Sequence, residues 1–260
     1  NRQVNPIETK EIKKTSGLVG CGRMEEQEVI REKVVDFFLT QNRFSKKKVL
    51  ITAGPTYENI DPVRFIGNHS SGKMGIALAE EFAAQGAEVT LLAGPGAPPV
   101  SHPNIKRFDF ISARELLEKT ISNYKNADVV VMAAAVADYT PEAVSKEKIK
   151  KAGDALTLKL KPTVDILKKL GEIKEHQFLV GFALETENAE QHAIQKLQNK
   201  NADLLVLNRA DAKSGSGFGV NTNQITIFSR QGEKTSYDVK PKTKVAVDIV
   251  NAVAKNLIPE

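Results

Sequence analysis

Residues 49–92 have the sequence VLITAGPTYENIDPVRFIGNHSSGKMGIALAEEFAAQGAEVTLL, and this stretch decides the fold class. It begins with a short aliphatic and β-branched run, which is typical of a buried strand. A polar, glycine-rich loop follows. A helix is then predicted over 73–85, with Gly86 as its stop signal, and a second strand over 88–92. Strand, loop, helix and strand in this order form the repeating unit of a parallel sheet.

The same order repeats along the chain. Ser112 has an acidic residue, Glu115, at the third position after it, which predicts a capped helix running to Tyr124. The apolar run over 128–133 predicts a strand buried on both faces. The remaining predicted elements are a strand at 178–184, a helix at 188–200, a strand at 203–207, a hairpin at 222–239 and a helix at 244–256. The pattern predicts an α/β fold with a Rossmann-like, doubly wound, mostly parallel sheet and a C-terminal hairpin.

The first 45 residues do not follow this order. Residues 1–24 show no sustained periodicity, 24–40 suit an amphipathic helix, and 41–48 form a polar linker. We therefore expect an appendage over 1–45 and one α/β domain over 46–260.

Composition excludes several classes of protein. The longest apolar run, Val129–Ala137, is far shorter than the roughly 20 residues that span a bilayer. A single cysteine excludes an internal disulfide and favours a reducing compartment. No export leader is visible, so a cytoplasmic protein without a membrane partner is expected.

The net charge of +5 raises the question of a polyanionic partner. The basic residues are spread along the chain. The chain has no Trp and four Tyr, which makes a poor stacking platform for nucleic acid. A small phosphorylated ligand needs only a few cations in one cleft. It is therefore the expected partner, rather than nucleic acid.

The loop over 52–75 is the first candidate site, because loops this long inside compact domains are usually functional. Ser70, Ser71 and Lys73 stand where a helix begins, which is typical of an anion site. Residues 67–73 match G-x-x-x-x-G-K, but Met74 replaces the Ser or Thr that a P-loop needs for Mg²⁺. Spacing for the dinucleotide motif G-x-G-x-x-G is absent as well.

Two further candidates follow later strands. After the 128–133 strand come small residues, then Asp138 and the lysines of 146–151. After the 178–184 strand, Lys196 and Lys200 lie four positions apart on one helix face, where both can point at a phosphate chain. For single lysines, solvation is the alternative, and Phe182 is as suited to a core as to stacking on a base. No histidine pair has metal-ligand spacing, which argues against a zinc site.

Five motifs in order are specific enough to compare with a known family: ITAGPT, DPVRFIGNHSSGKMG, AAAVADY, EKIKK and GFALETEN. They resemble phosphopantothenate–cysteine ligases, over about residues 47–256. Residues 16–30 resemble the tail of the flavin-dependent decarboxylase domain that precedes the ligase in bacterial bifunctional proteins. The resemblance implies that 1–45 is that tail plus a linker. It also implies that FMN belongs only to the missing decarboxylase domain.

The family resemblance implies a two-step ligation in coenzyme A biosynthesis. The carboxylate of 4′-phosphopantothenate attacks CTP to give an acyl-cytidylate and pyrophosphate, and the amine of L-cysteine then displaces CMP. Mg²⁺ is expected with CTP, held chiefly by phosphates and water. A homodimer is implied too, with residues 138–160 as the projecting dimerisation segment.

The resemblance also implies residue roles. Asn68 matches a residue that contacts the acyl intermediate, Arg64 one associated with the second step, and Lys148 one that assists acyl-cytidylate formation. Substrate binding falls to Asn68, Arg64 and Ala135. The nucleotide-binding residues expected from the loop and the resemblance are Gly54, Ser70, Ser71, Gly72, Lys73, Ala133, Ala134, Ala135, Asp138, Lys148, Val164, Asp165, Ile166, Leu167, Phe182, Lys196 and Lys200. No side chain is assigned to a metal.

Several questions stay open at this point. Residues 70–73 suit the phosphate of either substrate or nucleotide, and strictness for CTP over other nucleotides is not set. The alternative functions are a nicotinamide-dependent oxidoreductase on a similar fold and a non-catalytic phosphate- or nucleotide-binding module.

Overall fold

The computed structural model describes residues 10–13, 19–23, 26–31, 42–151, 153, 155–185, 189–209 and 219–257. The chain divides into two compact units, residues 1–43 and 44–260. In the first unit, β1 (Lys10–Lys13) and β2 (Val19–Arg23) pair antiparallel. Within the predicted 24–40 helix, residues 27–31 are helical, and 24–25 and 32–40 lie outside the described residues.

The second unit is built on an eight-stranded sheet of order β15-β14-β12-β11-β8-β3-β6-β7. Its strands are β3 (Lys48–Ala53), β6 (Glu88–Ala93), β7 (Ile105–Asp109), β8 (Val129–Met132), β11 (Phe178–Glu185), β12 (Leu204–Arg209), β14 (Ile225–Ser229) and β15 (Lys234–Ser236). Strands β12, β11, β8, β3, β6 and β7, which are neighbours in this order, run parallel. Strands β14 and β15 add an antiparallel hairpin at one edge. The predicted α/β class, mostly parallel sheet and terminal hairpin are confirmed.

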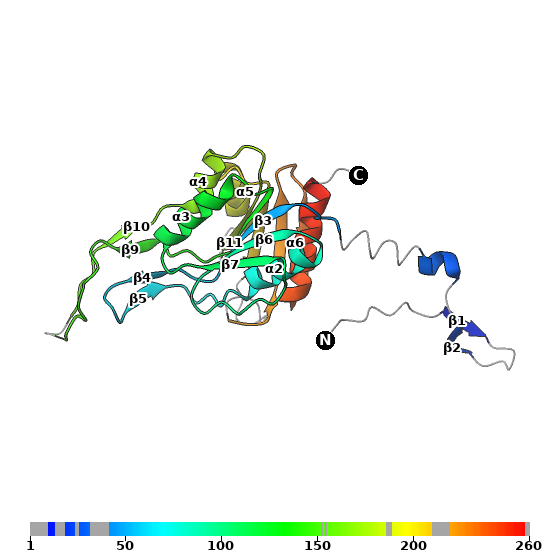
Figure 1. Cartoon of the computed structure of the whole chain (residues 1–260), viewed down its shortest axis with the longest axis horizontal. Coiled ribbons are helices and arrows are strands. Elements are labelled where there is room, and N and C mark those ends of the chain that lie inside the picture. Colours follow the sequence, from blue (N-terminus) through cyan, green and yellow to red (C-terminus); the bar gives the residue numbers. More distant parts are fainter. Residues whose placement is uncertain are drawn as a thin grey trace. The chain divides into compact units, whose positions relative to one another are not determined.

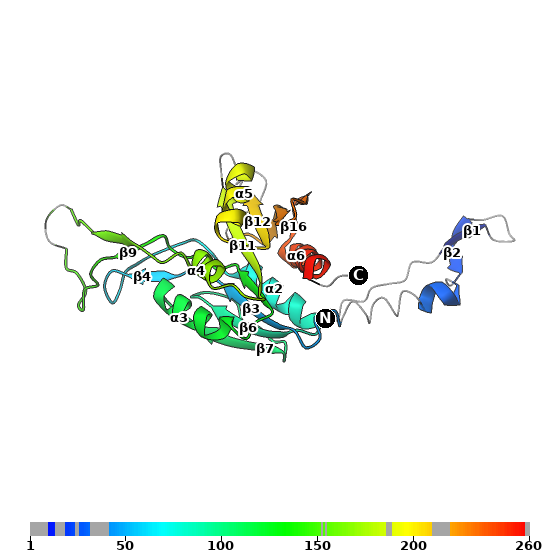
Figure 2. The same cartoon turned by 90° about the horizontal axis from the view of Figure 1, so that it is seen from above.

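Five helices cover the two faces of this sheet (Figures 1 and 2). They are α2 (Lys73–Ala84), α3 (Ala113–Tyr124), α4 (Ile166–Glu172), α5 (Ala189–Asn199) and α6 (Lys242–Leu257). Side chains alternate across a strand, so Val129 and Val131 of β8 pack with the α2 and α6 core. Val130 and Met132 pack with α3, α4 and α5. This two-sided burial explains the unbroken apolar run of the strand.

The helix boundaries follow the sequence signals closely. The Ser112 hydroxyl accepts a hydrogen bond from the Glu115 backbone N–H at 3.2 Å, as the cap prediction requires. Helix α4 was not predicted, although Asp165 caps it by accepting from the Lys168 N–H at 3.0 Å. Its seven residues are too few to show helical periodicity. Among the described residues, none of the helices is both long and apolar enough to cross a membrane.

Two small hairpins interrupt the βα order. Strands β4 (Tyr57–Asn59) and β5 (Phe65–Gly67) pair antiparallel inside the stretch that the sequence suggests is loop. Their Tyr57 and Phe65 rings stack with centroids 3.7 Å apart. Strands β9 (Tyr139–Pro141) and β10 (Leu160–Pro162) also pair. The chain between them, described over 142–151, 153 and 155–159, extends away from the sheet and is called the arm (Figure 1). A short pair, β13 (Thr222–Asn223) and β16 (Lys240–Pro241), precedes α6.

Candidate functional site

Two adjoining cavities lie at the carboxyl ends of β8 and β11, close to where α2 begins. The first has a volume of about 140 Å³ and the second about 370 Å³. Ala134 and Phe182 line both, so the two cavities adjoin at these residues, and together they are called the cleft. Neighbouring strands β3 and β8 lead to helices on opposite faces of the sheet, which is where α/β folds bind ligands.

The structure brings most of the predicted binding residues to this cleft. The first cavity is lined by the predicted residues Ser70, Ser71, Gly72, Lys73, Ala133, Ala134, Ala135 and Phe182. The second is lined by the predicted residues Ala134, Asp138, Val164, Asp165, Ile166, Leu167, Phe182, Lys196 and Lys200. Gly54, Arg64, Asn68 and Lys148 line neither cavity.

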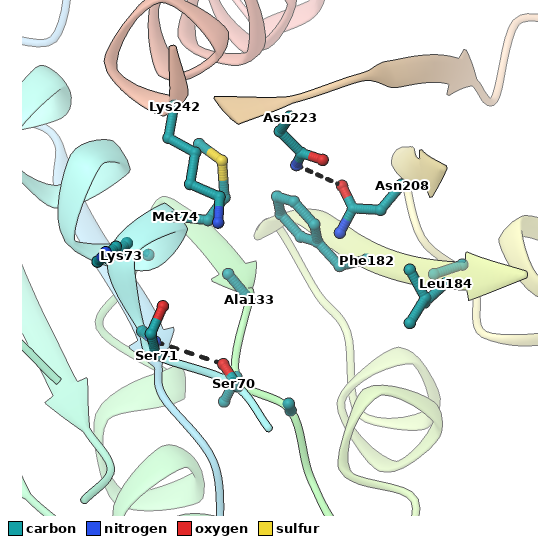
Figure 3. A pocket seen from close by; sticks show the side chains of 15 residues that line it. Ser70, Ser71, Lys73, Met74, Ala133, Phe182, Leu184, Asn208, Asn223 and Lys242 are labelled. Carbon is teal, nitrogen blue, oxygen red and sulfur yellow. Dashed lines mark hydrogen bonds between the residues drawn. The ribbon is translucent and has the colours of Figure 1, made fainter. Parts of the chain in front are cut away.

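The first cavity is closed on one side by the N-terminus of α2 (Figure 3). Gly72 precedes the helix with φ 71°, a left-handed conformation, and a Cβ there would lie 2.8 Å from the Ala97 methyl. The Ser70 hydroxyl accepts a hydrogen bond from the Gly72 N–H at 3.4 Å. The Lys73 ammonium donates to the Asn221 side-chain oxygen at 2.8 Å. Helix N–H groups and an ammonium at one cavity wall favour an anion.

Asn68 binds the strand end that divides the cleft. Its side-chain nitrogen donates to the carbonyl oxygens of Ala135 at 3.1 Å and Val136 at 3.0 Å. The Ala135 N–H in turn donates to the Gly54 carbonyl at 2.9 Å. Gly54 therefore holds the Ala133–Ala135 segment through its backbone, and Asn68 fixes the loop after β5 to the same segment.

Arg64 is held by an acidic residue that the sequence did not single out. Its Nη2 lies 2.9 Å from an Asp61 carboxylate oxygen and donates to the Ile149 carbonyl at 2.5 Å. Asp61, only 1% exposed, also accepts from the N–H groups of Val63, Arg64 and Ile149. Burial pushes the pKa of Asp61 upward, but these backbone hydrogen bonds and the Arg64 charge outweigh it, so the pKa lies below its usual value.

This arrangement binds the arm next to Lys148. Both the N–H and the carbonyl of Ile149 are taken up by the Asp61–Arg64 pair. Lys148 itself is exposed on the arm. A buried carboxylate with three backbone donors is a structural anchor, and only contacts across the fold could have revealed it.

The second cavity has acidic and basic groups together. Asp138 lies at its rim, and Asp165 and Lys200 form an ion pair. Burial lowers the pKa of Lys200. Phe182 lies between the two cavities and is partly exposed. A flat ring and a carboxylate that line the same cavity suit an aromatic base that carries an amino group.

Three polar residues of the first cavity could not be assigned from the sequence: Asn208, Asn223 and Lys242. The Asn223 side-chain nitrogen donates to the Asn208 side-chain oxygen at 3.0 Å (Figure 3). Lys242, 8% exposed, donates to the Val220 carbonyl at 2.7 Å. A signal for it existed, because Lys242 shares one helical face with the buried Val245, Ala246 and Ile249.

Comparison with known proteins gives consistent matches. The family profile described as the DNA/pantothenate metabolism flavoprotein C-terminal domain matches residues 44–257. A protein named cysteine/cysteine sulfinic acid decarboxylase, from an unknown prokaryotic organism, is 45% identical over 92% of this chain and 67% of its own length. The coenzyme A biosynthesis bifunctional protein CoaBC of Bacillus subtilis is 44% identical over 95% of this chain.

A solved structure matches as well. The crystal structure of the C-terminal domain of a coenzyme A biosynthesis bifunctional protein CoaBC has a TM-score of 0.72 and 41% identity. The match covers 84% of this chain and 100% of that one. The present chain spans only 61% of the length of the Bacillus subtilis protein, so it corresponds to part of such a relative.

Proposed function

The chain belongs to the family of the DNA/pantothenate metabolism flavoprotein C-terminal domain, and we propose that it ligates 4′-phosphopantothenate to L-cysteine at the expense of CTP. The observation that carries this proposal is the divided cleft. Among the described residues, the first cavity is lined by Lys73 and Lys242, and the second by carboxylates together with lysines; the Phe182 ring lines both. A nucleotide needs both surroundings, one for its phosphates and one for its base.

The first step joins the two anionic substrates. A carboxylate oxygen of 4′-phosphopantothenate attacks the α-phosphorus of CTP, and pyrophosphate leaves. Because both reactants are negatively charged, the main work of the protein is to neutralise charge and align them. We assign base recognition to Asp138 and Phe182, and charge neutralisation at the α-phosphate to Lys148 on the arm.

The second step uses the segment that divides the cleft. The amine of cysteine attacks the acyl carbon, the amide bond forms, and CMP leaves. Asn68, which is bound to the Ala135 and Val136 carbonyls, lies beside this segment and is assigned to orient the acyl group. Arg64 is assigned to the same step. It acts there by positioning the arm, since it donates a hydrogen bond to the Ile149 carbonyl.

Mg²⁺ enters this scheme as part of the nucleotide substrate. Among the described residues, no three His, Cys, Asp or Glu side chains are grouped where they could hold a metal ion. A triphosphate with water supplies the oxygen ligands that Mg²⁺ prefers. We therefore assign no resident metal ligand and propose Mg²⁺–CTP as the substrate.

A homodimer is the proposed assembly. Apolar side chains on and beside the arm are exposed, among them Tyr139, Val144 and Leu160. Exposed apolar clusters of this kind mark protein interfaces. Light scattering of the purified chain checks the assembly, and a monomer at assay concentration would contradict it.

The test is pyrophosphate release from CTP with Mg²⁺ and 4′-phosphopantothenate, with and without cysteine. We expect release without cysteine, and CMP with the amide product only when cysteine is added. Lys148→Ala should slow pyrophosphate release, whereas Asn68→Ala should slow product formation. Lys159→Ala, an exposed lysine on the same arm, is the matched control and should behave like the parent.

The same reaction mixtures separate the alternatives. Cysteine decarboxylation, the activity in the name of one relative, would release CO₂ from cysteine without CTP. A nicotinamide-dependent oxidoreductase would respond to NAD(P), and a binding module would bind nucleotide without turnover. Any of these results in place of CTP-dependent ligation would refute the proposal.

A further inference from the structure

The hairpin of β4 and β5 ends in a tight turn, residues 60–64, that Asp61 closes. The N–H groups of Ile60 and Asp61 donate to the Arg64 carbonyl at 2.8 and 3.3 Å. One carboxylate oxygen of Asp61, Oδ1, accepts from the N–H groups of Val63 and Arg64, both at 2.8 Å. A side-chain oxygen that accepts from the backbone two and three residues further on fixes a turn. Oδ1 therefore has a local task.

The second carboxylate oxygen of Asp61, Oδ2, binds the arm. It accepts from the Ile149 N–H at 3.1 Å and lies 2.9 Å from Arg64 Nη2. That nitrogen donates in turn to the Ile149 carbonyl at 2.5 Å. Four residues earlier on the arm, the Ser145 N–H donates to the Ile60 carbonyl at 3.0 Å. The turn thus holds the backbone of the arm at two positions.

Lys148 lies between these two attachments, three residues after Ser145 and one before Ile149. Its side chain is exposed, so the backbone of the arm decides where the ammonium group can reach. Groups that act on a reacting centre need to be held to a fraction of an ångström, and a misplacement of about 1 Å can cost on the order of a hundredfold in rate. The two attachments are therefore placed where they fix the position of Lys148.

Closing the turn does not by itself require the carboxylate of Asp61. Asn and Ser close turns of this kind with a single side-chain oxygen and no charge. Asp61 is only 1% exposed, and a buried charge is costly unless it is paired and hydrogen-bonded. What a second, charged oxygen adds here is the bond to the Ile149 N–H and the ion pair with Arg64. The residue type is thus explained by the arm and not by the turn.

We propose that Asp61 is a positioning residue for the first step, which holds the arm backbone beside Lys148 so that the ammonium group meets the α-phosphate. This inference rests on the proposed function and adds Asp61 to it. Asp61 takes no part in the bonds that form and break. Its effect on the rate passes through Lys148.

Asp61→Asn separates the tasks of the two oxygens. The amide has one oxygen, which keeps the turn when it takes the place of Oδ1. The amide nitrogen then faces the Ile149 N–H and the Arg64 guanidinium, which are donors as well, so the attachment of the arm is lost. Glu58→Gln is the matched control. Glu58 is a buried carboxylate on β4 that accepts from the Ala113 N–H at 2.8 Å, and its partner is the start of α3 instead of the arm.

Two measurements on the full chain follow the arm and the first step. Hydrogen exchange over residues 145–149 reports the attachment, and pyrophosphate release from Mg²⁺–CTP with 4′-phosphopantothenate and without cysteine reports the first step alone. Asp61→Asn should speed the exchange and slow the release by about tenfold or more. Glu58→Gln should leave both as in the parent.

A double-mutant cycle distinguishes positioning from a general structural effect. In the Lys148→Ala background the group that Asp61 positions is absent, so adding Asp61→Asn should slow pyrophosphate release by less than about twofold. A general structural effect would slow release by the same factor in both backgrounds, and that result would overturn the inference. So would faster exchange with an unchanged rate, or unchanged exchange over 145–149.

A second variant covers the case in which Asp61→Asn does not fold, as thermal unfolding will show. Ile149→Pro removes the donor of the same hydrogen bond from the arm, outside the buried core. It must slow pyrophosphate release in the parent and not in the Lys148→Ala background, or the inference is wrong. A parent chain that releases no pyrophosphate from CTP would refute the proposed function itself, which is a separate outcome.

Discussion

Gly75 fixes how closely helix α2 approaches the central strand, and Gly75→Ala is the sharpest test of that packing. A Cβ at this position would lie 2.5 Å from the Ala53 Cβ, 2.9 Å from the Ala53 Cα and 3.0 Å from the Thr52 carbonyl oxygen. Ala53 belongs to β3, which is bonded to β6 on one side and β8 on the other. The strand cannot give way easily, so the helix must move.

Two opposing effects set the size of the change. Replacing Gly by Ala inside a helix stabilises it by about 1 kcal/mol. Overpacking a well-ordered core costs about 1–3 kcal/mol, and the upper part of that range applies here because the nearest atoms are backbone and a short methyl group. The net prediction is a loss of about 1–2 kcal/mol in the free energy of unfolding.

The displacement should also reach the site. Gly75 lies two residues after Lys73 and lines the first cavity itself, so a shift of α2 away from β3 moves the anion-binding wall of that cavity. We therefore expect weaker CTP binding together with lower stability. A fall in stability without any change in CTP affinity would show that the start of α2 is independent of its packing on Ala53.

Urea unfolding of a double-mutant cycle is the assay. Ala53→Gly removes the methyl group nearest the added one, so the pair Gly75→Ala and Ala53→Gly should be more stable than the sum of the single changes predicts, by about 1 kcal/mol. If Gly75→Ala is as stable as the parent, or if the two changes are additive, the steric argument is wrong.

The remaining predictions concern two buried titratable side chains, Asp61 and Tyr124. The lowered pKa of Asp61 stabilises the fold above the unfolded value of 3.8, and this stabilisation is lost as the pH falls through the lower folded value. Asp61→Asn should therefore make the free energy of unfolding less dependent on pH below about 4, as urea titrations at several pH values can measure. Tyr124 donates to the Leu170 carbonyl at 3.0 Å, so Tyr124→Phe should destabilise the fold by about 1–2 kcal/mol. Burial raises the pKa of Tyr124 from 10.0 to about 12, so the stabilisation that the neutral phenol contributes is lost as the pH rises from 10 to 12. The Tyr124→Phe variant has no phenol at this position and should not show that loss.

Local patterns were sufficient to predict most of the sheet and its helices. Val129–Met132 is buried along its whole length and is an unbroken apolar run in the sequence. Ser112 caps α3 by accepting a hydrogen bond from the N–H of Glu115, only three residues further along the chain. Strand β7 could not be predicted because most of its side chains are exposed and its sequence, IKRFD, does not alternate between apolar and polar residues. Hairpin β4–β5 was missed because it depends on a stacking contact between Tyr57 and Phe65, eight residues apart across a turn.

The site shows the same limit. Residues that share a loop or a helix face, such as Ser70 with Lys73 or Lys196 with Lys200, could be grouped from the sequence alone. Asp61 could not, because its partner Ile149 is 88 residues away. For the same reason, the sequence could not show that Lys242 lines the same cavity as Lys73. Only its place on an apolar helix face marked Lys242 as unusual.

The Asp61 anchor bears on how Arg64 can act in catalysis. Its Nη2 is engaged by the Asp61 carboxylate and the Ile149 carbonyl, so the guanidinium is held by the loop and the arm at once. Direct contact with an acyl intermediate would have to use its other N–H groups while these bonds persist. If the bonds break instead, the arm segment that carries Lys148 loses its attachment to the loop at Asp61 and Arg64. Arg64 therefore links the residue assigned to the first step with the loop that carries Asn68, assigned to the second. On this geometry, Arg64→Ala should disturb both steps, whereas an arginine that contacts only the intermediate would affect the second step alone.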